Sequence, residues 1–386
     1  MTTSAINRRT FVACAAGGAA AVALPLSASA DEGAAAAQDA FDAHGSSVRA
    51  IAEAADTIEC DVAVVGAGAA GLMAALHAAE LGYKVCLLEK GPSTAASNFA
   101  QCGGPNACET HIQEAEGEWV SLDDMFKYMY GFSNTSVNAK LLKNVLAGTG
   151  PAINKMEELG VPMELWGDPY GVGFRGRHYI LADGLGRTEP LTQEIERLGA
   201  TVVYGADVYA VLMEDGAAKG VQADIDGTVT DVLAKATVVC TGGFLGNETM
   251  QREHFNTPVF PLGNTVSDGT GIQMVLNAGG VLDRAFSVLG NECGAVSKSA
   301  EGWPFTPEWK NNNEHWGYWL FGGLYVDATG NRFIDEGKVA ELPLAIGGEA
   351  LVRAGKAYVI MDSAYYDGCQ NQGIYAVLGK PAEWTA

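Results

Sequence analysis

The sequence predicts an α/β fold, and two features of one segment indicate it. An apolar run at Asp61–Val65 is followed at once by the glycine-rich stretch Gly66–Gly71 and then by apolar residues at helical spacing. A second apolar run, Lys84–Leu88, comes after that helix. Uninterrupted apolar runs are typical of parallel strands that are buried on both faces. Strand, helix and strand in this order make one βαβ unit of a Rossmann-like sheet.

Later segments continue this alternation. We expect a strand at Asp61–Val65, a helix from Leu72 that stops at Gly82, and a strand at Lys84–Leu88. The further elements that we expect are a helix at Thr192–Leu198, strands at Thr201–Tyr204, Val208–Met213, Val221–Ile225 and Ala236–Cys240, and a turn at Glu214–Gly216. From about residue 281 the composition becomes rich in Trp, Asn and Gly, which indicates a second domain.

Composition narrows the class of protein. The 386 residues are 48% hydrophobic and 18% charged, which excludes a disordered chain and allows a sizeable core. The chain has 24 Lys and Arg against 46 Asp and Glu, a net charge of −22. Nucleic acid is therefore not an expected partner, because binding phosphates requires clustered cations. Eight Cys are too few for a disulfide scaffold. Cys102 and Cys108 could pair, but we expect free thiols, and we expect no metal site.

The first thirty residues are typical of an export signal. They contain no Asp or Glu, carry the pair Arg8 and Arg9 before an apolar stretch, and end in the small residues Ala28–Ala30. The paired arginines indicate a signal of the twin-arginine type, and an ordinary Sec signal is the alternative. We expect residues 1–30 to be this signal and residues 31–57 to be a linker. The mature protein is then expected in the periplasm or extracytoplasmic cell envelope, with no transmembrane segment.

The glycine-rich stretch predicts a dinucleotide site. Gly66 permits a tight turn, Gly68 lets the backbone approach a pyrophosphate, and Gly71 allows close helix–strand packing. The N-terminus of the following helix offers N–H groups and a partial positive charge to phosphates. Glu89 ends the second strand, where its carboxylate can accept hydrogen bonds from ribose hydroxyls. The alternative is a structural turn without a ligand, and the pattern by itself does not separate FAD from NAD.

Five further segments together resemble the FAD-dependent oxidoreductase 2 family, the fumarate reductase/succinate dehydrogenase flavoprotein superfamily with its exported flavocytochrome c-like reductases. They are Ala95–Asn98 with Gly103–Asn106, Ala206–Val208, Cys240–Asn247, Ser267–Gly271 and Gly322–Glu336. The resemblance implies FAD as cofactor, a Rossmann-like FAD-binding domain over residues 58–280 and an inserted α+β capping domain over residues 281–386. It implies cofactor contacts from Gly66, Ala67, Gly68, Gly71, Glu89, Lys90, Ser97, Asn98, Gly103, Gly104, Val208, Thr241, Gly242, Gly243 and Asp268. Asp268 could bind ribityl hydroxyls or cap the helix that follows it.

The expected substrate site departs from the family pattern. The position of the family's proton-donating Arg falls on Ala340, and a family Thr-Glu pair falls on His315–Trp316. We therefore do not expect fumarate itself as the substrate. Aromatic residues crowd the stretch from His315 to Tyr325, which suits a planar or apolar substrate such as an aryl-acrylate or a steroid-like enone, or else packs a small core.

Three side chains are candidates to replace the missing proton donor. They are Tyr318, Lys338 and His315, and Tyr318 comes first because a phenol can protonate an enolate carbon. The segment Arg175–His178 is another polar cluster, which we expect on the surface or beside the phosphates rather than as an acid.

These features predict an exported FAD-dependent reductase that transfers hydride from flavin N5 to an activated C=C bond of a small molecule. The chain has no Cys-x-x-Cys-His motif for its own haem, so an external donor such as a c-type cytochrome is expected. A dehydrogenase of a ketosteroid-like substrate is one alternative. A truncated, non-catalytic FAD-binding remnant is the other, because family members carry a later glycine-rich flavin segment that we do not find before Ala386. On that reading the chain holds the adenine half of FAD but binds the flavin ring poorly.

Overall fold

The centre of the fold is a six-stranded mixed sheet. The computed structural model describes residues 48–100, 104–133, 135, 137–166, 176–182, 184–254, 266–282, 323–336, 350, 354 and 357–372. Within these, the strand order is β5-β2-β1-β8-β7-β6, with the first four strands parallel and the last two antiparallel. The strands are β1 (Asp56–Val65), β2 (Val85–Leu88), β5 (Thr201–Val203), β6 (Ala206–Glu214), β7 (Ala217–Ile225) and β8 (Thr228–Val239).

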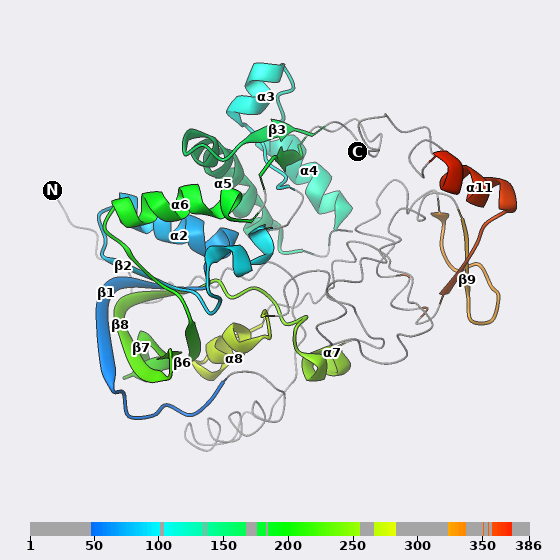
Figure 1. Cartoon of the computed structure of the whole chain (residues 1–386). Helices are drawn as coiled ribbons and strands as arrows, with labels where there is room; N and C mark the ends of the chain where they lie inside the picture. Colours follow the sequence, from blue (N-terminus) through cyan, green and yellow to red (C-terminus); the bar gives the residue numbers. More distant parts are fainter. Residues whose placement is uncertain are drawn as a thin grey trace.

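Helices cover both faces of this sheet, and each face has its own apolar core (Figure 1). Helices α2 (Ala69–Glu80), α6 (Leu185–Arg197) and α5 (Ala139–Glu158) pack on the face that carries Val64 and Leu87. Helix α8 (Thr270–Asn277) packs on the opposite face, near β6. Side chains of a strand alternate between faces, so a parallel strand covered on both sides must be apolar throughout.

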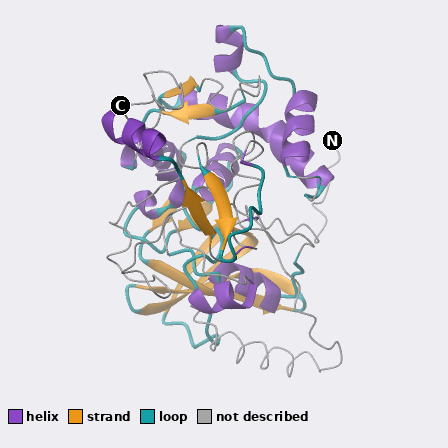
Figure 2. Cartoon of the chain, turned by 90° about the vertical axis from the view of Figure 1, so that its right-hand side faces the viewer, coloured by secondary structure: helices purple, strands orange, loops and turns teal. Residues whose placement is uncertain are grey.

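The remaining described elements lie outside this sheet and its main covering helices. They are the 3₁₀ turns η1 (Thr94–Ala96) and η2 (Asn98–Ala100), helices α3 (His111–Glu116), α4 (Leu122–Phe132), α7 (Glu248–His254) and α11 (Ser363–Gln372), and the strand pairs β3 (Met163–Leu165) with β4 (His178–Ile180) and β9 (Leu324–Asp327) with β10 (Ala357–Ile360). Figure 2 shows the pair of β9 and β10 in the foreground, apart from the large sheet. These two strands belong to the sequence region expected to form the second domain.

The expected α/β class is confirmed, while several element bounds differ. Strand β1 begins at Asp56, so the expected domain boundary at residue 58 falls inside a strand. Helix α6 begins at Leu185 and includes Pro190, although the sequence predicted a helix only from Thr192. Among the described residues, no helix is long and apolar enough to cross a membrane.

One polar side chain that the sequence predicted outside the core, His178, is buried. His178 has no exposed surface, and its Nε2 lies 2.8 Å from the Thr110 hydroxyl while its Nδ1 lies 3.3 Å from the Gly176 carbonyl oxygen. Burial lowers the pKa of this imidazole. A surface position, one of the two expected for the Arg175–His178 cluster, is therefore wrong for His178, because strand β4 turns this side chain inward; a position beside the phosphates stays a prediction.

Candidate cofactor site

Three parallel strands end at the same edge of the sheet, and the glycine-rich turn lies there. The Gly66 N–H donates to the Leu88 carbonyl at 2.7 Å, and the Cys240 N–H donates to the Val65 carbonyl at 2.7 Å. A Cβ on Gly66 would lie 2.6 Å from the Cys240 carbonyl oxygen, and φ is +94°. A Cβ on Gly71 would lie 1.7 Å from the Gly66 carbonyl oxygen. Both glycines are thus required by close backbone contacts within the fold.

Gly68, unlike Gly66 and Gly71, is not required by a close contact within the fold. It is the N-cap of helix α2, which has no side-chain cap hydrogen bond and no acidic residue in its first turn. The nearest heavy atom to a Cβ on Gly68 would be Ser97 Cβ, at 3.8 Å, so the fold itself has room for a side chain. An uncapped helix N-terminus beside open space can bind phosphate through its N–H groups and its dipole.

Glu89 is a buried carboxylate that shapes the loop around this turn. It is 7% exposed, and its two oxygens accept hydrogen bonds from the N–H groups of Ala67 and Gly91, both at 2.7 Å. Each carboxylate oxygen has a second lone pair, so the group can still accept from ribose hydroxyls. The expected ribose contact and the observed loop contacts are therefore compatible.

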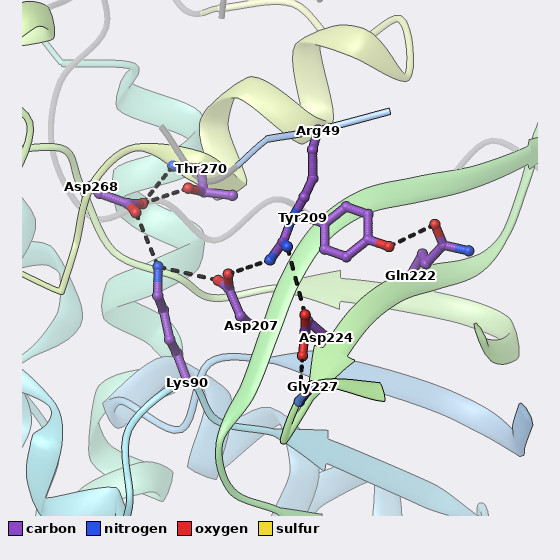
Figure 3. A network of polar contacts seen from close by, with 9 residues as sticks. All are labelled: Arg49, Lys90, Asp207, Tyr209, Gln222, Asp224, Gly227, Asp268 and Thr270. Carbon is purple, nitrogen blue, oxygen red and sulfur yellow. Dashed lines mark hydrogen bonds and ion pairs between the residues drawn. The ribbon is translucent and has the colours of Figure 1, made fainter. Parts of the chain in front are cut away.

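Strand β6 begins beside Glu89. The Ala206 N–H donates to the Glu89 carbonyl at 2.9 Å, and Val208, expected near the adenine, is buried. Lys90 follows Glu89, and Figure 3 shows its ammonium between two carboxylates. Its Nζ lies 3.2 Å from Asp207 Oδ1 and 3.1 Å from Asp268 Oδ2.

Both partners in the shorter of these ion pairs are held in their charged forms. Burial would lower the pKa of Lys90, but the carboxylates of Asp268 and Asp207 outweigh burial and raise it. Burial would raise the pKa of Asp268, but hydrogen bonds from Thr270 and the charge of Lys90 lower it. The site therefore carries fixed charges of both signs at neutral pH.

The two family-like segments that follow β8, Cys240–Asn247 and Ser267–Gly271, contact each other through hydrogen bonds. The Gly269 N–H donates to the Gly243 carbonyl at 3.1 Å, and the Asn247 side-chain amide donates to the Asp268 carbonyl at 3.0 Å. A Cβ on Gly271 would lie 1.9 Å from Thr241 Oγ1, so this close approach requires glycine. A Cβ on Gly243 would meet nothing within 4 Å, which leaves its backbone open to a ligand.

Asp268 acts as a local cap in this structure. Its Oδ1 accepts from the Thr270 N–H at 3.0 Å and from the Thr270 hydroxyl at 2.6 Å, at the start of helix α8. Its second oxygen binds Lys90. Asp268 therefore binds the first residue of α8, although the N-cap residue itself is Gly269, and a ribityl contact of Asp268 stays a prediction.

The other sequence-predicted residues have mixed outcomes. Ser97 lies near the turn, and its hydroxyl donates to the Thr94 carbonyl at 2.9 Å, while Asn98 is exposed. Gly104 packs against β4, because a Cβ there would lie 1.8 Å from the His178 carbonyl oxygen. Thr241 and Gly242 follow β8 after one intervening residue, Cys240. Gly103, His315, Tyr318, Lys338 and Ala340 lie outside the described residues.

One residue of the expected aromatic cluster can be placed, and it belongs to a packed core. Tyr325 lies in β9, is 3% exposed, and its N–H donates to Glu336 Oε1 at 3.0 Å. Arg332 also contacts the carboxylate of Glu336, and the pKa of Glu336 falls to about 2, mainly through this hydrogen bond. Tyr325 is therefore part of the strand pair rather than of an open aromatic wall.

The residues present fit a dinucleotide. An uncapped helix N-terminus, a glycine with space beside it and a buried carboxylate acceptor meet at the carboxyl edge of a parallel sheet, where such ligands bind. Within the part of the chain that the structure describes, no group of three or more His, Cys, Asp or Glu is placed to hold a metal ion. The sequence missed Arg49, which reaches this region from the expected linker and has no motif to signal it.

Comparisons with known proteins agree with this geometry. The family described as "FAD binding domain" matches residues 61–289, more than half of the chain. A vinyl phenol reductase of Lactiplantibacillus plantarum is 27% identical over 333 residues, which cover 83% of this chain and 64% of that protein. A fumarate reductase (cytochrome) of Shewanella frigidimarina is 27% identical over 351 residues, 84% of this chain and 55% of that protein. The chain thus spans less than two thirds of the length of these relatives.

A solved structure shows the same fold. The 3-ketosteroid-delta4-(5alpha)-dehydrogenase of Rhodococcus jostii RHA1 superposes with a TM-score of 0.60 at 20% identity, covering 86% of this chain and 76% of that one. The glycine turn, the buried carboxylate and the family match lead to one conclusion. The chain belongs to the FAD binding domain family, within the fumarate reductase/succinate dehydrogenase flavoprotein superfamily, and its cofactor is FAD.

Proposed function

We propose that this chain belongs to a reductase that adds two electrons and two protons to an activated C=C bond of an organic acceptor. The observation that carries the proposal is the convergence of Gly68, Glu89 and Asp268 at one sheet edge in a chain of this family. The relatives named vinyl phenol reductase and fumarate reductase support it, because the compounds in both names contain a C=C bond.

The residues of the site have separate tasks in this proposal. The N–H groups at the start of α2 bind the diphosphate, and Glu89 accepts from ribose hydroxyls. Asp268 and Lys90 hold the first turn of helix α8 in position. When bound, FAD supplies two-electron chemistry as hydride transfer, which suits reduction of a C=C bond.

An aryl-substituted alkene is the substrate class that we propose. The position expected for the family's proton-donating Arg falls on Ala340, and this supports a substrate other than a fumarate-like dicarboxylate. The vinyl phenol reductase, whose name specifies an aromatic compound, aligns over most of this chain. Tyr318, Lys338 and His315 remain the proposed proton donors. A c-type cytochrome remains the proposed electron donor, which the net charge of −22 would attract through a basic surface.

Oxidation of reduced methyl viologen by the FAD-loaded protein tests the proposed reaction. We expect 4-vinylphenol or cinnamate to give a kcat/KM at least about tenfold above that of fumarate, because a pocket shaped for a planar ring gains contacts with the aryl group and cannot pair both carboxylates of fumarate. The Gly68→Ala variant is the matched control for dependence on the bound cofactor. Faster turnover of fumarate would contradict the substrate class. Dye reduction by a saturated ketosteroid would favour the dehydrogenase, and no turnover with saturating FAD would favour a non-catalytic protein.

We also propose that the protein is exported by the twin-arginine route, on the strength of Arg8, Arg9 and the small residues Ala28–Ala30. In a bacterial host with this route, we expect the periplasmic fraction to contain protein that begins at Asp31. Replacing both arginines by Lys should leave the full-length chain in the cytosol, as immunoblots of the two fractions would show. Undiminished export of that variant would indicate a Sec signal instead.

A further inference from the structure

A segment ahead of the βαβ unit is bound to the antiparallel part of the sheet. Residues 48–55 precede β1, and Val48 is only 3% exposed within the core on the α8 face. The Ala52 N–H donates to Gln222 Oε1 at 2.8 Å, and Gln222 Nε2 donates to the Ala52 carbonyl at 2.9 Å. Gln222 is fully buried and also accepts from the Tyr209 hydroxyl at 2.8 Å. The segment is therefore held by a specific buried partner.

Because the segment is held in this position, the Arg49 side chain contacts two carboxylates at the same time. Its Nη2 lies 2.7 Å from Asp207 Oδ2, and its Nη1 lies 3.6 Å from Asp224 Oδ2. Its Cζ lies 4.3 Å from the centre of the Tyr209 ring. Figure 3 shows the guanidinium lying between the ring and the two acids. A planar guanidinium can bind two carboxylates through separate N–H groups while its flat face stacks on an aromatic ring, a combination that the compact ammonium of lysine provides less well.

The two acids need this cation because of their register. Asp207 on β6 and Asp224 on β7 are directly paired across the antiparallel ladder. Like charges directly opposite each other destabilise a strand pair. Asp224 is also fixed by accepting from the Gly227 N–H at 2.7 Å in the turn before β8, so it cannot turn away without breaking that contact.

Asp207 connects Arg49 to the cofactor site. Its other oxygen binds Lys90, and Lys90 binds Asp268, so the charges alternate in sign from Arg49 to the start of α8. Asp207 also lies between Ala206, which bonds to the Glu89 carbonyl, and Val208. Displacing Asp207 would therefore move the strand that borders Glu89 and would draw Lys90 away from Asp268.

We propose that Arg49 is a positioning residue for FAD. Arg49 neutralises the opposed carboxylates of Asp207 and Asp224, and this keeps the first residues of β6 against Glu89. Lys90 can then keep its ion pair with Asp268. The adenine side of the cofactor site thus includes a residue from outside the nucleotide-binding unit. This role concerns cofactor binding and does not depend on which substrate is reduced.

The test measures binding of FAD and of ADP to the full chain by calorimetry. ADP carries the adenine and diphosphate without the flavin ring. We expect Arg49→Gln to raise both dissociation constants about tenfold, the size of coupling usual for contacting charged groups. Adding Asp224→Asn to this variant should restore both values to within about threefold, because the repulsion is gone while the amide oxygen still accepts from Gly227.

The matched control is Lys235→Gln, which removes an exposed ion pair to Asp61 in the same sheet and should change neither constant. Unchanged binding in Arg49→Gln overturns the proposal, even if the melting temperature falls. So does a loss of binding that Asp224→Asn does not restore. If Arg49→Gln does not fold, Arg49→Lys replaces it. We expect about a threefold rise that Asp224→Asn again reverses, and an unchanged constant overturns the proposal.

Discussion

Gly71→Ala is expected to abolish FAD binding in practice, with a dissociation constant raised at least about 100-fold. The new methyl group would lie 1.7 Å from the Gly66 carbonyl oxygen, and this backbone atom has no freedom to move aside. The turn must open, which separates the Ala67 N–H from the Glu89 carboxylate. Overpacking of this kind costs about 3 kcal/mol or more of unfolding free energy. Fluorescence quenching of added FAD and urea unfolding measure the two effects.

Two other glycines provide controls for this prediction. Gly148 also lies in a helix, α5, and a Cβ there meets nothing within 4 Å, so Gly148→Ala should leave FAD binding unchanged and stabilise by up to ~1 kcal/mol. Gly68→Ala should keep the free energy of unfolding without FAD, because its Cβ has room, yet weaken FAD binding. A Gly71→Ala protein that binds FAD like the wild type would show that the turn is not the pyrophosphate site.

Glu89→Gln has the second-largest expected effect. The carboxylate accepts from two backbone N–H groups, but an amide has one oxygen, so one buried N–H would face an NH₂ group. An unpaired buried donor costs about 1–3 kcal/mol of unfolding free energy. The loss of an ionised acceptor for ribose hydroxyls should raise the dissociation constant for FAD by about 10- to 100-fold. Calorimetry with FAD and urea unfolding without it separate these contributions.

Glu214→Gln is the matched control for this substitution. The Glu214 side chain is 69% exposed and pairs only with Lys219 among the described contacts, so neither stability nor FAD affinity should change measurably. Equal FAD affinity in Glu89→Gln and wild type would mean that the ribose does not reach this carboxylate. The loop contacts of Glu89 would then be its whole role.

The sequence could predict the nucleotide-binding unit because its constraints are local. Gly66, Gly68 and Gly71 lie within six residues, and the clash of Gly71 with the Gly66 carbonyl is a direct consequence of that spacing. Glu89 could be placed because a strand of known direction ends there. Apolar runs likewise predicted the parallel strands, since a strand covered on both faces leaves no other composition possible.

What the sequence could not predict depends on contacts between distant segments. Arg49 and Asp207 are 158 positions apart, and no periodicity in the expected linker points to the sheet. Gly104 was expected in a ligand loop, and nothing in the sequence indicated that its small size also serves the contact with His178 on β4. Helix α6 was expected to start after Pro190, yet that proline is accommodated inside the helix. In each case a tertiary contact decides what the local pattern leaves open.

The pairing of β1 with β8 has a consequence for biosynthesis. Val65 on β1 lies opposite Val239 on β8. The glycine turn is bordered by the ends of β1, β2 and β8, and β8 is synthesised long after β1 and β2. While the ribosome produces the intervening segments, β1 presents an unpaired edge of apolar residues. Such delayed, non-local pairing slows folding and exposes the nascent chain to aggregation. We therefore expect the nascent chain to be most prone to aggregation over that interval, and the complete glycine turn to form only after residue 240 has left the exit tunnel.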